Sequence, residues 1–176
     1  IATPVVSDYV INYYQDGTAP TNPETAGLTA FSQQSGGSPI LTDTWYNHAS
    51  PYFVWPAAED TNGASDTSTG SGVAGYHVYF GSNASADPAV DGTYQTANTF
   101  VPSSMAASTT NYLRIKTVDN AGNISAATWQ PFEYKFDAAA PSAPASLASD
   151  PSGYSATDSF NFSWAQVLEG AVPAAQ

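Results

Sequence analysis

The stretch Asp16-Gly-Thr-Ala-Pro-Thr-Asn-Pro23 returns 121 residues later as Asp137-Ala-Ala-Ala-Pro-Ser-Ala-Pro144. Both copies begin with Asp and carry an Ala-Pro pair followed by a second Pro. Proline cannot continue a central strand, so each copy is expected to leave one folded unit and enter the next. Self-similarity at a fixed spacing indicates a repeat architecture.

A second pair of segments extends the similarity, because Phe53-Val-Trp55 is echoed by Phe162-Ser-Trp164. The sequence therefore predicts three parts. They are the last strand and linker of a preceding repeat, one complete β-sandwich repeat, and the first strands of a following repeat, at residues 1–19, 20–140 and 141–176 respectively.

Composition favours short strands joined by turns. Hydrophobic residues make up 42% of the 176 residues and aromatic residues 13%, with 13 Gly and 13 Pro. The absence of Cys excludes thiol catalysis, thiolate metal sites and disulfides. No run approaches the roughly 20 apolar residues of a membrane helix, so direct membrane insertion is not expected.

The formal net charge is −12. Such a surface repels nucleic acid and could attract divalent cations. The only three basic residues, Arg114, Lys116 and Lys135, are predicted to face outward and to form a contact face for an acidic neighbouring repeat.

Apolar and polar residues alternate in several segments, which predicts strands half-buried against one core. The clearest are Tyr76-His-Val-Tyr-Phe80, Leu113-Arg-Ile-Lys-Thr117 and Phe132-Glu-Tyr-Lys-Phe136. Phe53 and Trp55 are also expected in the core. Asp91-Gly92 is a hairpin signal, and 119–123 predicts a tight turn. We therefore expect an all-β sandwich.

The order of these segments resembles a fibronectin type III or bacterial immunoglobulin-like repeat of surface or extracellular proteins. The resemblance covers about residues 20–140 and implies an immunoglobulin-like β-sandwich. It rests on Ala19-Pro20, Trp55, Gly75-Tyr-His-Val-Tyr79 and Leu113-Arg-Ile-Lys-Thr-Val-Asp-Asn-Ala-Gly-Asn123. The chain departs from the pattern at Asn111, where the family has a Tyr, and residues 42–52 are an addition to a minimal module.

The resemblance implies a non-enzymatic structural or adhesive role in a secreted or cell-surface bacterial protein, as spacer, adhesin stalk or filament subunit. Its partners would be neighbouring repeats or copies of itself. The alternative is a carbohydrate-binding accessory module of a secreted enzyme, with a glycan or another surface protein as partner. Only His48 and His77 could act as imidazole bases, and no nucleophile elbow, phosphate loop or zinc-protease motif is present, so no enzyme activity is expected.

An aromatic group suggests a saccharide site. Trp45 and Tyr46, with His48 nearby, would offer rings on which a sugar could stack. The alternative is that these residues cover one end of the sandwich.

Calcium is the cofactor that the sequence favours, because hard cations take carboxylate and carbonyl oxygens. Asp119, Asn120 and Asn123 form one oxygen-rich turn, and Asp60, Asn62 and Asp66 form another. Asp16 and Asp137 recur at the repeat junctions, where a bound ion would stiffen the linker. The predicted calcium ligands are Asp119, Asn120, Asn123 and Asp137, and the alternative is that these residues only stabilise turns.

Overall fold

The computed structural model describes residues 15–61, 70–105, 108–156 and 158–167. Its elements are strands, one short 3₁₀-helix and one four-residue α-helix within these ranges. In chain order they are η1 (Thr25–Gly27), β1 (Thr29–Phe31), β2 (Thr44–Tyr46), β3 (Tyr52–Val54), β4 (Val73–Gly81), α1 (Pro88–Asp91), β5 (Thr93–Gln95), β6 (Thr99–Phe100), β7 (Thr109–Asp119), β8 (Trp129–Phe136), β9 (Ala148–Asp150) and β10 (Asn161–Ser163). The all-β prediction is confirmed.

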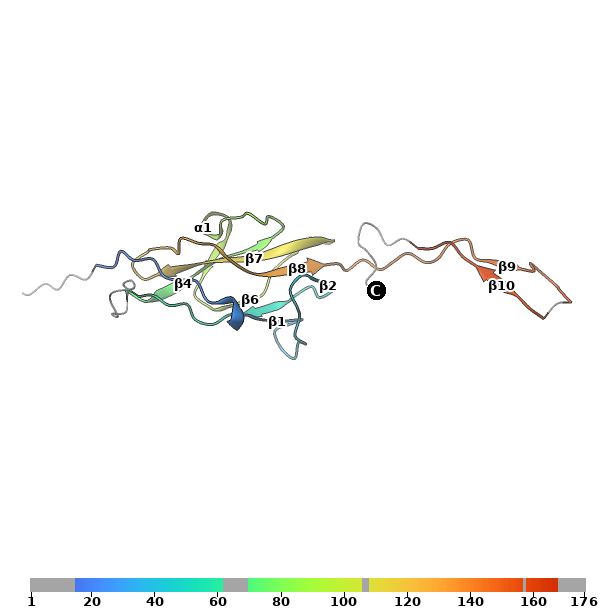
Figure 1. Ribbon diagram of the computed structural model, residues 1–176, viewed down its shortest axis with the longest axis horizontal. Coiled ribbons are helices and arrows are strands. Elements are labelled where there is room, and N and C mark those ends of the chain that lie inside the picture. Colours follow the sequence, from blue (N-terminus) through green and yellow to red (C-terminus); the bar gives the residue numbers. More distant parts are fainter. Residues whose placement is uncertain (1–14, 62–69, 106–107, 157, 168–176) are drawn as a thin grey trace, which may run out of the picture.

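Two sheets face each other in the main body (Figure 1). One has the strand order β1-β3-β6, and the other has the order β2-β8-β7-β4-β5. All pairs are antiparallel except β2 with β8, which is parallel. No described helix is long and apolar enough to cross a membrane.

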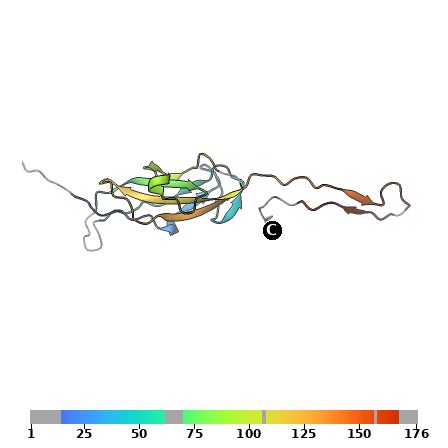
Figure 2. The same ribbon diagram turned by 90° about the horizontal axis from the view of Figure 1, so that it is seen from above.

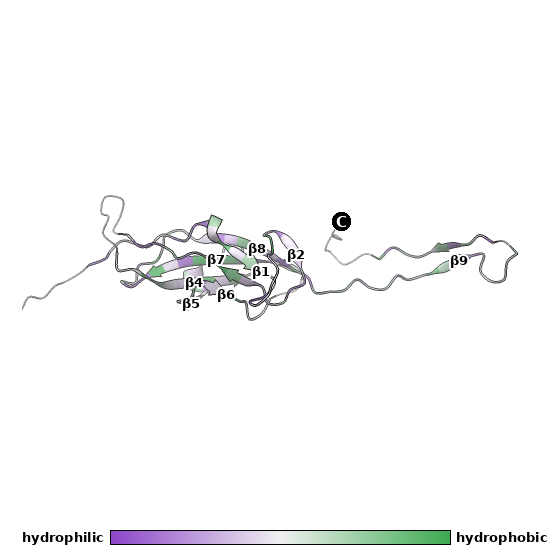
Figure 3. Cartoon of the chain, turned by 90° about the horizontal axis from the view of Figure 1, so that it is seen from below, coloured by the Kyte–Doolittle hydropathy of each residue, from purple (hydrophilic) through white to green (hydrophobic). Residues whose placement is uncertain are grey.

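The core lies between the sheets and follows the predicted alternation, which is visible as changing hydropathy along the strands (Figure 3). Leu113 and Ile115 of β7 are fully buried, and the residue between them, Arg114, is partly exposed. Phe53 packs edge-on against Phe132 from the facing sheet, with ring centroids 5.2 Å apart. Side chains that alternate across a strand thus place one apolar row on each inner face.

One irregularity in β8 has a sequence cause. The register with β7 shifts between Leu113 and Ile115, so that Gln130 and Pro131 together lie opposite Arg114. Proline lacks the N–H that a ladder needs and is tolerated at such a bulge.

The hairpin signal at Asp91-Gly92 lies in the connection between β4 and β5, which pair antiparallel, but the two residues do not form a two-residue turn. Asp91 instead ends α1, and Gly92 follows as its C-cap. The preceding residues favour a helical turn, because the Asp87 carboxylate accepts a hydrogen bond from the Ala89 N–H at 3.0 Å and Pro88 occupies the first helical turn.

The segment 42–52, predicted as an addition, contains β2. This strand lies at the edge of the five-stranded sheet and runs parallel to the end of β8, with Thr44 opposite Tyr134 and Tyr46 opposite Phe136. It covers part of the edge of β8 that would otherwise expose unpaired backbone groups.

Beyond β8 the chain runs without regular structure to a separate hairpin of β9 and β10 (Figures 1 and 2). Its pairing resembles that of β1 with β3 in the sandwich. Ser149 lies opposite Phe162, as Ala30 lies opposite Phe53.

Tyr134 makes the stability sensitive to alkaline pH. Burial raises the pKa of Tyr134 to about 12 from its ordinary value of 10.0, and its hydroxyl donates to the His48 carbonyl oxygen at 2.7 Å. The neutral form is therefore favoured by folding, and its contribution, full below pH 10, is lost as the pH rises through about 12. We expect the free energy of unfolding of Tyr134→Phe, measured by urea denaturation, to fall less between pH 10 and 12 than that of the wild type. An equal fall in both proteins would contradict this.

Candidate metal centre

Three aspartates from distant parts of the chain meet at the end of the sandwich that the linker enters. Asp16 lies in that linker, Asp60 lies between β3 and β4, and Asp119 is the last residue of β7. One carboxylate oxygen from each lies within 4.8 Å of those of the other two. Asp60 and Asp119 are only 8% and 2% exposed. We call this group the aspartate triad.

Asp16 is fixed by backbone donors. Its Oδ2 accepts a hydrogen bond from the Ser71 N–H at 2.6 Å, and its Oδ1 accepts one from the Thr18 N–H at 3.0 Å. The hydrogen bonds from Ser71 and Thr18 hold the pKa of Asp16 below its ordinary value, so this carboxylate is ionised at neutral pH. The linker is thereby attached to the loop before β4.

Asp60 is held by the same loop. Its Oδ2 accepts a hydrogen bond from the Gly72 N–H at 2.7 Å, and its backbone oxygen accepts one from the Gly70 N–H. A Cβ at Gly70 would lie 2.5 Å from Oδ2 of Asp60, so the close approach requires glycine. Oδ1 of Asp60 is buried and accepts no hydrogen bond.

The turn after β7 positions Asp119. Its two carboxylate oxygens accept hydrogen bonds from the backbone N–H and the side-chain Nδ2 of Asn123, both at 2.7 Å. The same Nδ2 also contacts the backbone oxygens of Asp16 at 3.2 Å and Thr18 at 3.4 Å. Gly122 supplies the positive φ of +91° that the turn needs. Asn123 therefore joins the turn to the linker and orients Asp119.

No basic side chain of the chain neutralises the triad. The sequence holds three Lys and Arg residues, and the structure describes all of them. Arg114 donates to backbone carbonyls near α1, Lys116 pairs with Asp87 at 3.0 Å, and Lys135 pairs with Asp43. The two histidines pack against tyrosine rings of β2 and β5. Among the described residues, the groups that donate to the triad are therefore uncharged: backbone N–H groups, the Asn123 amide and the Ser71 side chain.

The structure divides the predicted calcium ligands. Asp119 and Asn123 lie in the centre, whereas Asn120 uses its Nδ2 to brace the loop before β4, donating to the carbonyl oxygens of Ser71 and Gly72. Asp137 follows β8 at the opposite end of the sandwich, about 30 Å away along β7.

The sequence also named Asp16 and Asp60, but placed them in different groups. Their meeting with Asp119 depends on how the linker and two loops fold together, which no local pattern encodes. Asn62 and Asp66 lie outside the described residues.

The three residues of the predicted saccharide site do not share one surface. Tyr46 packs toward the core, with its ring stacked on those of Tyr134 and His48 at centroid distances of 5.9 and 5.5 Å. Trp45 is the preceding residue of β2, so its side chain leaves on the other face of the strand. Tyr46 therefore packs its ring on Tyr134, and the backbone oxygen of His48 accepts the Tyr134 hydroxyl. Saccharide binding stays a prediction.

The predicted cationic contact face is also engaged within the chain. Arg114, Lys116 and Lys135 have the partners given above, and the side chain of Lys116 is only 14% exposed. Contact of these residues with a neighbouring repeat stays a prediction.

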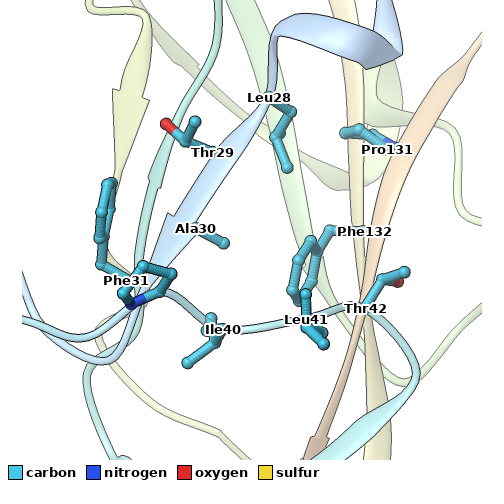
Figure 4. Close-up of a pocket in the computed structure, with 10 residues that line it drawn as sticks. Leu28, Thr29, Ala30, Phe31, Ile40, Leu41, Thr42, Pro131 and Phe132 are labelled. Carbon is cyan, nitrogen blue, oxygen red and sulfur yellow. The ribbon is translucent and has the colours of Figure 1, made fainter.

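An apolar cleft of about 400 Å³ lies between β1, the segment 39–42 and β8 (Figure 4). Leu28, Ile40 and Phe132 line it, and none of its lining residues carries an ionisable side chain. The cleft therefore offers no acid–base or metal-binding group, in contrast to the triad.

Comparisons of the chain with protein-family models, with curated proteins and with solved structures found no match in any of the three.

The Gly70→Ala substitution is expected to destabilise the protein by about 1–3 kcal/mol, because the new methyl group must displace the buried carboxylate of Asp60. Urea denaturation of the two proteins measures the difference. Gly17→Ala is the matched control, since a Cβ there meets no atom within 4 Å and the expected change is under about 0.5 kcal/mol. Equal effects of the two substitutions would contradict the packing around Asp60.

Proposed function

We propose that the chain is a non-enzymatic structural segment of a secreted or cell-surface protein, built from immunoglobulin-like modules in tandem. Its role is to space or present other parts of a larger protein or filament. The observation that supports the proposal is the separate β9–β10 hairpin, whose pairing resembles that of β1 with β3 in the sandwich.

The β9–β10 hairpin resembles the β1–β3 pair in sequence and in strand pairing. Phe162 faces Ser149 as Phe53 faces Ala30, and each Phe is followed two residues later by Trp. The exposures differ, however. Phe53 is 0% exposed and Phe162 is 64% exposed. The β9–β10 hairpin thus carries large apolar residues that no other strand covers in the described part of the chain.

The strand order supports an immunoglobulin-like arrangement. Immunoglobulin sandwiches place strands A, B and E in one sheet and C, F and G in the other. Labelled in this way, β1, β3 and β6 take the places of A, B and E, and β4, β7 and β8 those of C, F and G. The strands β5 and β2 extend the second sheet at its two edges.

The layout of the ends fits an end-to-end chain of modules. The linker that holds Asp16 reaches the sandwich at one end, and the linker after Asp137 leaves at the other (Figure 1). Force applied along such a chain passes through the sandwich lengthwise, so each module would carry load as a unit.

Two substitutions at repeat-equivalent positions separate the complete module from the uncovered hairpin. Phe53→Ala is expected to cost about 3–5 kcal/mol of the free energy of unfolding, because it opens a cavity in a closed core. Phe162→Ala, at the equivalent position, should cost less than about 0.5 kcal/mol. Urea denaturation followed by tryptophan fluorescence checks both values. A large loss in Phe162→Ala would mean that the hairpin is packed in solution.

Single-molecule force spectroscopy tests the proposed role. With handles on both ends of the chain, we expect one cooperative unfolding event with a contour-length gain of about 36–40 nm. About 120 residues extend to about 40–43 nm, and the folded module already spans roughly 3.6 nm along the 11 residues of β7. Phe53→Ala should lower the unfolding force and leave the gain unchanged. Gradual lengthening without a discrete event would rule out a load-bearing module.

Light scattering tests filament assembly separately. A stable monomer at all concentrations would rule out assembly by this chain alone.

A further inference from the structure

We propose that the aspartate triad, Asp16, Asp60 and Asp119, binds a calcium ion that fixes the entering linker to the sandwich. This inference concerns the triad and does not depend on the mechanical role proposed above.

The first step is distance. Calcium binds oxygen at 2.3–2.6 Å, so two ligands of one ion lie at most about 5 Å apart. One carboxylate oxygen from each member of the triad lies within 4.8 Å of the others. Three oxygens each 4.8 Å apart lie about 2.8 Å from their common centre, so side-chain shifts of a few tenths of an ångström bring all three to calcium-bonding distance. Magnesium, with bonds of 2.0–2.1 Å, accepts separations of at most about 4.2 Å and holds its octahedron more strictly.

The second step is an unpaired ligand atom. Asp60 is more than nine-tenths buried, and its Oδ1 has no hydrogen-bond partner. In the part of the chain that the structure describes, only one other buried side-chain atom lacks a partner, the indole Nε1 of Trp55 in the aromatic core. A buried carboxylate oxygen is costly to leave unpaired, and the other two carboxylates of the triad can only accept. A cation would satisfy all three.

The third step is charge. The three basic side chains of the sequence contact other groups, as described above, so the chain has no cation of its own to place there. The donors that do reach the triad come from Ser71, Gly72, Thr18 and Asn123. These donors hold the carboxylate oxygens in place.

The fourth step is ligand chemistry. The triad offers carboxylate oxygens only, and the sequence has no Cys and no His near it. Such a set suits a hard cation and does not suit zinc or copper. Three carboxylates supply fewer than the six to eight oxygens that calcium takes, so water or backbone carbonyls complete the shell and the affinity is modest, on the order of 0.1–1 mM.

The consequence is a connection between the linker and the module. Asp16 belongs to the linker, and the other two ligands belong to the sandwich. Because the ion needs both, its binding holds the linker in one orientation relative to the module. The repeat places Asp137 at the same position of the next linker, and Asp137 Oδ1 already accepts a hydrogen bond from the Ala139 N–H, as Asp16 Oδ1 does from Thr18.

The test uses the full chain stripped of metal with a chelator. Isothermal titration calorimetry with calcium chloride should show one site, and 10 mM calcium should raise the melting temperature by roughly 4–8 °C over the value in chelator. Asp60→Asn should weaken binding by at least about tenfold and abolish the rise, and Asp16→Asn should do the same. Asp60→Asn should not lower the melting temperature in chelator, because one amide oxygen can still accept from the Gly72 N–H. Asp16→Asn should lower it, because an amide has one acceptor oxygen for the two N–H groups of Thr18 and Ser71, so for this variant the loss of the calcium-dependent rise is the readout.

Asp137→Asn is the matched control, since it removes the same charge from the same local turn at the other linker. It should bind calcium and melt like the wild type. No heat and no melting shift with wild-type protein at 10 mM calcium would overturn the proposal. A shift that Asp60→Asn and Asp16→Asn retain would also overturn it, as would equal loss in Asp137→Asn.

A second readout follows the linker. Amide hydrogen exchange at Thr18 and Ser71, whose N–H groups bind Asp16, should slow when calcium is added to the wild type and stay unchanged in Asp60→Asn. Exchange that calcium leaves unaltered in the wild type would contradict attachment of the linker by the ion.

Discussion

The structure depends on aromatic side chains that join its two sheets. Phe53 meets Phe132 edge-on, and Trp55 meets Tyr76 in the same way with ring planes at 87°. Edge-to-face contacts are more favourable than face-to-face stacking, and rings of this size bury a large apolar area. The strands of the three-stranded sheet have only two or three residues each. Its contact with the facing sheet therefore relies on a few large rings, Phe53 of β3 and Trp55 just after it.

The sequence predicted what repeats along a single strand. Alternation located β4, β7 and β8 and their inward residues, because period-two burial is a local property. It failed for α1, where the cap at Asp87 and Pro88 outweighed the Asp-Gly signal. It also predicted no strand in the segment that forms β2, because a three-residue edge strand has too few residues to show a period.

The sequence indicated the members of the candidate centre one by one, but not that they lie together. Asp16, Asp60 and Asp119 each stood out as turn or junction residues, yet 103 residues separate the first from the last. What unites them is the loop at Gly70 to Gly72, whose N–H groups reach two of the carboxylates. The glycines of this loop match no motif in the sequence. The reason for Gly70 is spatial, because a Cβ there would collide with the Asp60 carboxylate.

The repeated Asp-x-x-Ala-Pro motif connects these points. Its prolines keep the linker out of the sheets. In both copies the Asp carboxylate accepts a hydrogen bond from the backbone N–H two residues later. In the first copy that Asp also reaches into the following sandwich, where two buried carboxylates lie beside it. In the proposed tandem arrangement, a motif that combines a proline break with an acidic anchor would separate the modules and restrict the angle between them. The three basic residues of the chain contact other groups, so an ion from solution is the neutralising group that we propose for this anchor.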